Sequence, residues 1–142
     1  MCGIVGITSS KEVTSRIIGS LKKLEYRGYD SAGIATIFEN NINEVKCEGR
    51  VNQLEKNVNQ TNLSGTTGIG HVRWATHGKP STINAHPHSS DNVSVVHNGI
   101  IENSTILKKI LEKKGYKFIS QTDTEVIVHL VTDYLKKNNL KD

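Results

Sequence analysis

The sequence predicts a single α+β domain, in which strands and amphipathic helices share one core. Its 142 residues are a length typical of one domain. Apolar runs alternate along the chain with segments whose apolar residues recur every three or four positions, the patterns of strands and of helices. With 35% hydrophobic and 23% charged residues and a mean hydropathy of −0.40, the composition is that of a soluble globular chain.

The first half of the chain predicts a strand, a helix, a hairpin and a second helix. Residues 2–8 are apolar or small and predict a buried strand. Residues 11–24 carry apolar side chains at spacings of four, four and three, which predicts an amphipathic helix. Residues 31–38 and 42–48 predict two strands joined by a turn, and residues 50–58 predict a short helix.

The second half predicts a long loop between short strands and two final helices. A strand is predicted at 67–73, a short buried strand at 93–96 and another strand at 116–119. Residues 74–92 contain both prolines and little periodicity, so they predict a long loop, and such loops are usually functional. Helices are predicted at 104–114 and at 123–137.

Several classes of protein do not fit the sequence. No run approaches the roughly 18 apolar residues of a membrane span, and no basic segment precedes the first apolar run, so we expect a cytoplasmic protein. The two cysteines are expected to stay as thiols. The net charge of +4 comes from lysines spread over predicted helix faces, which does not favour binding to nucleic acid.

Cys2 is the candidate nucleophile. Removal of Met1, which requires a small second residue, would leave a thiol and a free α-amine on one residue. An α-amine titrates at about 7.7 to 8.0, so it can take the thiol proton directly or through one water. The alternative is that Cys2 is a small buried residue at the start of a strand. Cys47 has no such amine and is predicted to be structural.

Four further residues suggest how a substrate is held. Asn98 and Gly99 follow a predicted strand and could donate a side-chain amide and a backbone N–H to an oxyanion, although Asn-Gly is more often just a turn. Arg73 could bind a carboxylate and Asp123 an ammonium group, the two ends of an amino acid. The alternatives are a surface ion pair for Arg73 and a helix N-cap for Asp123.

No metal or cofactor site is predicted. The histidines of the loop region lie close together in sequence, but no Cys-x-x-Cys or His-Glu-x-x-His pattern accompanies them. We expect these histidines to hold backbone groups of the loop.

Six motifs occur in the order found in one family. They are Met-Cys-Gly-Ile-Val-Gly at 1–6, Glu-Tyr-Arg-Gly-Tyr-Asp-Ser-Ala-Gly at 25–33, His-Val-Arg-Trp-Ala-Thr-His-Gly at 71–78, Asn-Ala-His-Pro-His at 84–88, Val-Val-His-Asn-Gly-Ile-Ile-Glu-Asn at 95–103 and Thr-Asp-Thr-Glu at 122–125. Over its whole length the chain resembles the class II glutamine amidotransferase (glutaminase) domain of the glucosamine-6-phosphate synthases, or glutamine:fructose-6-phosphate aminotransferases. That domain is an N-terminal-nucleophile hydrolase.

The resemblance implies a catalytic role for three residues. Cys2 would be the nucleophile, with its own α-amine as the base. Asn98 and Gly99 would form the oxyanion hole. His86 matches a family position and would support the site.

The resemblance also implies how L-glutamine is bound. Arg73 would bind its α-carboxylate and Asp123 its α-amine. Thr76 and His77 would line the pocket, and Trp74 would lie in the loop that closes over glutamine.

The fold implied by the resemblance is a sandwich of two antiparallel sheets between helical layers. In the family this domain extends past residue 142 and two sugar-phosphate isomerase domains follow it. We therefore expect residues 1–142 to be the N-terminal portion of the amidotransferase domain, truncated and incomplete at the C-terminus.

The expected function is hydrolysis of the glutamine side-chain amide. The ammonia would serve synthesis of glucosamine 6-phosphate from fructose 6-phosphate, a step that needs a separate sugar-phosphate isomerase domain. The alternative is a catalytically inactive chain that acts at most as a binding module.

Overall fold

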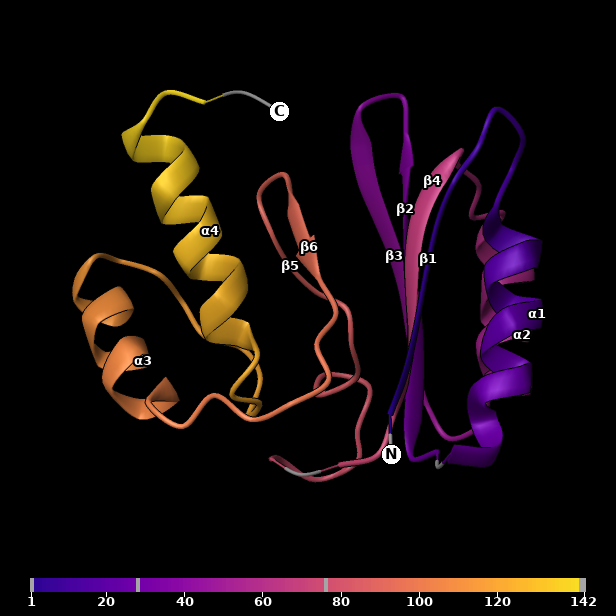
Figure 1. The fold of residues 1–142 in the computed structure, drawn as a ribbon, viewed down its shortest axis with the longest axis horizontal. Coiled ribbons are helices and arrows are strands. Elements are labelled where there is room, and N and C mark those ends of the chain that lie inside the picture. The colour runs from indigo at the N-terminus through magenta and orange to yellow at the C-terminus, as the bar shows by residue number, and fades with distance from the viewer. Residues whose placement is uncertain (1, 28, 76, 141–142) are drawn as a thin grey trace.

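The computed structural model describes residues 2–27, 29–75 and 77–140. Helices α1 and α2 cover one face of a four-stranded sheet, and a small hairpin with helices α3 and α4 lies on the other side (Figure 1). The predicted α+β class is confirmed.

The large sheet is antiparallel, with the strand order β1-β4-β2-β3. Its strands are β1 (Gly3–Thr8), β2 (Ser31–Phe38), β3 (Asn41–Glu48) and β4 (Thr67–Arg73). The predicted hairpin is confirmed, and its turn uses positive φ angles at Glu39 and Asn40, as tight hairpin turns require. The prediction that residues 2–8 form a buried strand is wrong in one respect: β1 is an edge strand, and Ile4 on its outer face is 40% exposed.

The main core lies between this sheet and helices α1 (Thr14–Leu24) and α2 (Val51–Thr61). Ile17 and Leu21 of α1 are fully buried against β4. Glycines in β4 allow this close approach, because a Cβ on Gly70 would lie 2.6 Å from Cγ2 of Ile17. Both helices were predicted, although α1 begins later than expected and α2 extends further.

The second layer holds β5 (His88–Ser90), β6 (Val93–Val95), α3 (Ser104–Lys113) and α4 (Glu125–Lys137). The strands β5 and β6 pair with each other as an antiparallel hairpin. The prediction that residues 74–92 are all loop is therefore wrong, since β5 lies within them. The strand predicted at 93–96 is present but half-buried rather than buried.

The strand predicted at 116–119 is absent, and these residues cross α4 as coil. The ring of Phe118 meets the ring of His129 edge-on at 4.6 Å. The backbone N–H groups of Ile119 and Ser120 donate to the Glu125 carboxylate at 2.8 and 2.7 Å. Since a side chain satisfies these donors, the segment has no need of a partner strand.

Within the described ranges, no helix has the length and apolar character needed to cross a bilayer.

Candidate functional site

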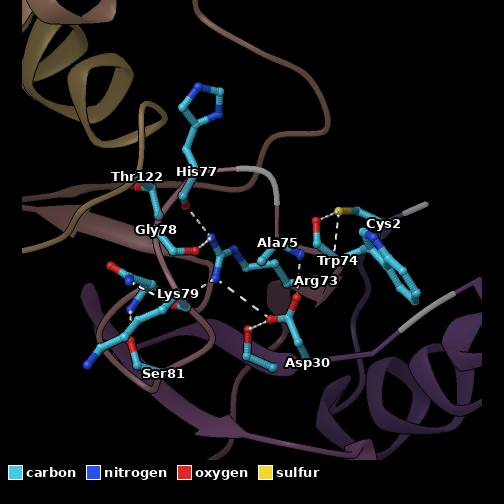
Figure 2. Close-up of polar contacts among 12 residues, drawn as sticks. Cys2, Asp30, Arg73, Trp74, Ala75, His77, Gly78, Lys79, Ser81 and Thr122 are labelled. Atoms are coloured by element: carbon cyan, nitrogen blue, oxygen red, sulfur yellow. Dashed lines mark hydrogen bonds and ion pairs between the residues drawn. The ribbon is translucent and has the colours of Figure 1, made fainter.

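The ends of three strands meet at one end of the large sheet, because each strand runs antiparallel to its neighbour. Gly3 of β1 pairs with Val72 of β4, and Ser31 of β2 pairs with Arg73 of β4. The residues that this pairing brings together are Cys2, Asp30, Arg73 and Trp74 (Figure 2).

The Cys2 thiol lies against the backbone of Trp74. Its Sγ accepts a hydrogen bond from the Trp74 N–H at 3.1 Å and donates to the Trp74 carbonyl oxygen at 3.4 Å. Cys2 is half-buried, so its sulfur is both held in place and accessible. The Trp74 side chain itself is 57% exposed.

Asn98 reaches Cys2 from a distant part of the chain. Its Nδ2 donates to the backbone carbonyl oxygen of Cys2 at 3.3 Å, and its Oδ1 lies 2.9 Å from Nε2 of His71. Gly99 follows directly, and a Cβ there would lie 2.7 Å from Nε2 of His97. The Asn98 amide therefore lies beside Cys2, and Gly99 lines the same pocket as both residues.

Arg73 is buried, with 3% of its surface exposed, so the alternative of a surface ion pair is wrong. Its Nη1 lies 3.7 Å from Oδ1 of Asp30. Its Nη2 donates to the carbonyl oxygens of His77 and, at 3.1 Å, of Gly78 (Figure 2). The guanidinium thus fixes the loop after β4 through hydrogen bonds to two of its carbonyl oxygens.

Asp123 does not cap helix α4, so that alternative is also wrong. The N-cap residue is Thr124, which makes no side-chain capping bond. Instead Oδ2 of Asp123 accepts the backbone N–H of Ile101 at 2.6 Å. This bond ties the segment after Gly99 to the start of α4, and the carboxylate keeps lone pairs for a further donor.

These residues surround one pocket with a volume of about 570 Å³. Its lining consists of Cys2, Arg73, Trp74, His77, His86, His97, Asn98, Gly99, Ile100, Thr122, Asp123 and Thr124. Every predicted site residue is among them except Thr76, which lies outside the described residues. A larger cavity of about 890 Å³ lies near the end of α4, but none of the predicted site residues lines it.

Three histidine rings pack behind the pocket. The ring centroids of His71 and His86 are 4.4 Å apart, and those of His86 and His88 are 4.7 Å apart. Burial lowers the pKa of His71 and of His88 to about 4 and lowers that of His86 still further. All three rings are therefore neutral near pH 7.

A chain of buried hydrogen bonds supports the loop before Asp123. It runs from Nε2 of His88 to the Thr122 hydroxyl at 2.8 Å, on to the Ser120 hydroxyl at 2.9 Å, and to Oε2 of Glu125 at 2.6 Å. Burial alone would raise the pKa of Glu125, but hydrogen bonds from Ser120 and from the Ile119 N–H outweigh burial and lower it. Glu125 is therefore the acceptor at the end of the chain.

Sequence reasoning gave no role to Asp30, His71 or Glu125. Asp30 could have been found from the hairpin and sheet pairing, which sets its neighbour Ser31 opposite Arg73. His71 and Glu125 offer no local signal, because their partners are distant in sequence or lie in an irregular segment.

The comparisons with known sequences agree with this geometry. A family described as a glutamine amidotransferase domain matches residues 71–141. Glutamine–fructose-6-phosphate aminotransferase (isomerizing) of Clostridium acetobutylicum is 56% identical over the whole of this chain, which covers 24% of that protein. The enzyme of the same name from Francisella tularensis is 57% identical over 97% of this chain, which covers 23% of that protein. The chain thus spans about a quarter of the length of the curated relatives it matches.

Solved structures of amidotransferases share the fold. A glutamine phosphoribosylpyrophosphate amidotransferase from B. subtilis, complexed with ADP and GMP, aligns with a TM-score of 0.70 and 31% identity, over 92% of this chain and 28% of that one. A structure titled as the allosteric regulatory enzyme of purine biosynthesis aligns with a TM-score of 0.72 and 32% identity, over 92% of this chain and 29% of that one. The family match and these alignments show that the chain belongs to the glutamine amidotransferase domain family, with the N-terminal-nucleophile hydrolase fold.

Proposed function

We propose that this chain hydrolyses the side-chain amide of L-glutamine to glutamate and ammonia, with Cys2 as the nucleophile. The observation that carries the proposal is the approach of Asn98 to Cys2. The Asn98 amide donates to the backbone carbonyl oxygen of Cys2, and both residues line the same pocket. Nucleophile and oxyanion donor are the two groups that acyl transfer from an amide requires.

The reaction begins once Met1 has been removed and the Cys2 amine is free. The amine takes the thiol proton, and Sγ attacks the amide carbon of glutamine. The amide oxygen becomes an oxyanion that accepts hydrogen bonds from Nδ2 of Asn98 and the N–H of Gly99. The carbon–nitrogen bond then breaks, and the leaving nitrogen takes the proton from the amine and departs as ammonia. Water hydrolyses the remaining glutamyl thioester and regenerates the thiol.

The two charged groups of glutamine find complementary partners in the pocket. Arg73 lines the pocket and would pair with the α-carboxylate through the positive charge of its guanidinium. Asp123 would accept from the α-ammonium group. Trp74, Thr76 and His77 would complete the glutamine site, with the exposed Trp74 at its rim.

The ammonia has a destination in the longer relatives. Their name describes amino transfer from glutamine to fructose 6-phosphate. We propose that residues 1–142 are the N-terminal portion of a cytoplasmic amidotransferase of this kind, and that a separate sugar-phosphate isomerase domain uses the ammonia to make glucosamine 6-phosphate.

Ammonia release from glutamine tests the proposal, measured on the protein that carries this chain. We expect release by the wild type and its loss in Cys2→Ala. The matched control is Cys47→Ala, which removes the buried cysteine and should retain activity. A folded wild type that lacks Met1, binds glutamine and releases no ammonia would instead indicate a binding module.

A further inference from the structure

We propose that His71 is a positioning residue that fixes the orientation of the Asn98 side-chain amide, so that its NH₂ group can donate to the oxyanion that forms on the substrate. The inference rests on the proposed glutaminase function. It adds His71 to the residues that serve the reaction. His71 contacts neither the Cys2 thiol nor the substrate and acts through Asn98, the oxyanion donor.

The contact joins a rigid element to an exposed loop residue. His71 is fully buried in β4, between Ile4 of β1 and Gly33 of β2 in the strand register. Asn98 is exposed and lies beyond the end of β6. The hydrogen bond of 2.9 Å between them is therefore an anchor for Asn98 from the interior of the sheet.

The direction of this hydrogen bond decides which way the amide points. With Oδ1 of Asn98 facing His71, the contact is a hydrogen bond in the His71 tautomer that carries its hydrogen on Nε2, because an amide oxygen can only accept. With Oδ1 held by His71, the NH₂ group is directed to the other side, where it donates to the Cys2 carbonyl oxygen at 3.3 Å. A flipped amide would instead turn its oxygen toward the Cys2 carbonyl oxygen and the developing oxyanion. This orientation is unfavourable because all of these oxygens carry negative charge.

The His71 ring has little freedom to leave this position. It packs on the ring of His86 with centroids 4.4 Å apart, and burial keeps it uncharged near pH 7 by lowering its pKa to about 4. The Cys2 thiol, by contrast, is held by the Trp74 backbone. Loss of the His71 donor should therefore weaken stabilisation of the oxyanion without changing the reactivity of the thiol.

The test compares His71→Leu with His71→Gln in the protein that carries this chain. Leucine has no donor, whereas the glutamine amide can place an N–H near the site of Nε2. We expect kcat for ammonia release to fall by about 100-fold in His71→Leu, the scale on which one oxyanion donor acts, with KM for glutamine unchanged. His71→Gln should recover most of kcat.

Two further readouts separate positioning from a merely structural role. Alkylation of Cys2 by iodoacetamide forms no oxyanion, so its rate should be the same in His71→Leu and wild type. Adding Asn98→Ala to His71→Leu should cost little more than His71→Leu alone, because the two residues act as one unit. The inference would be overturned if His71→Leu slowed alkylation of Cys2 as much as it slowed ammonia release, or if it raised KM and left kcat intact. It would also be overturned if the effects of His71→Leu and Asn98→Ala on kcat were fully additive.

A crystal structure of His71→Leu tests the inference independently of turnover. We expect Nδ2 of Asn98 to have left the Cys2 carbonyl oxygen, whereas an unchanged amide would contradict the role of His71. If the wild type releases no ammonia, the proposed function fails, and this structural comparison still decides what His71 does to Asn98.

Discussion

Buried histidines behind the pocket make the stability of this protein depend on pH at the scale of single residues. In the unfolded chain a histidine titrates near its ordinary pKa of about 6.5, whereas burial lowers the pKa of His71 and His88 to about 4 in the fold. Between these values the unfolded chain binds more protons than the folded one. The contribution of these two histidines to the free energy of unfolding is therefore fully present above about pH 6.5. It is lost progressively as the pH falls toward 4.

Urea unfolding between pH 7.5 and 4.5 measures this effect. Each of these histidines contributes a slope of up to about 1.4 kcal/mol per pH unit in the free energy of unfolding. His88→Gln should reduce the slope, because it removes one of the two rings whose pKa burial lowers to about 4. A free energy of unfolding that stays constant down to pH 4.5 would show that these rings are not buried as neutral groups.

Asp30 is the carboxylate that faces the buried Arg73, and its removal should be costly. It lies 3.7 Å from the guanidinium and accepts the Ala75 N–H. Asp30→Asn leaves Arg73 buried without its counter-charge, so we expect a loss of about 1–3 kcal/mol in the free energy of unfolding and a higher KM for glutamine. Chemical denaturation and steady-state kinetics measure the two effects.

The matched control for that substitution is Asp133→Asn on α4. Asp133 also forms ion pairs, with Lys114 and Lys137 at 2.7 and 3.1 Å, but these lysines are exposed, and exposed ion pairs contribute little. If Asp133→Asn destabilised the protein as much as Asp30→Asn, burial of Arg73 would not explain the effect.

At the scale of elements, strand β2 lies directly against the segment that carries His86, because Gly33 has no side chain. The backbone carbonyl oxygen of His86 occupies the place of a Gly33 Cβ, and backbone cannot move aside as a flexible side chain can. Gly33→Ala should displace the segment that carries His86, destabilise the protein by about 1–3 kcal/mol and lower glutaminase activity.

Gly19→Ala is the companion substitution in helix α1. A Cβ on Gly19 meets nothing within 4 Å, so alanine should raise the free energy of unfolding by about 0.5–1 kcal/mol through its better helix propensity. Urea unfolding of both variants gives the comparison. Equal effects of the two alanines would contradict the close packing of His86 on β2.

Local patterns predicted most elements, and failures fall where tertiary contacts decide. The bounds of β4 at 67–73 were predicted in full. This strand lies between β1 and β2 and is paired on both sides. Residues 116–119 have the composition of a strand, yet the Glu125 carboxylate takes two backbone donors there. The polar segment His88–Ser90 carries no strand pattern and pairs only because β6 lies beside it.

At the scale of the whole molecule, the pocket is assembled from five separated parts of the chain. They are Cys2, the end of β4 with its loop, His86, residues 97–100 and residues 122–124. The motifs predicted which residues take part, because sequence motifs identify residue types. They could not predict that Arg73 is buried on Asp30 or that Asn98 is anchored by His71, since both contacts depend on strand register and on the packing of two layers.

Covalent labelling with an electrophilic ketone analogue of glutamine tests the central claim most directly. After peptide mapping by mass spectrometry, we expect a single adduct on Cys2, found in chains without Met1, suppressed by excess glutamine and absent from chains that retain Met1. A natively folded protein without Met1 that stays unlabelled, or that is labelled at Cys47 instead, would contradict the account.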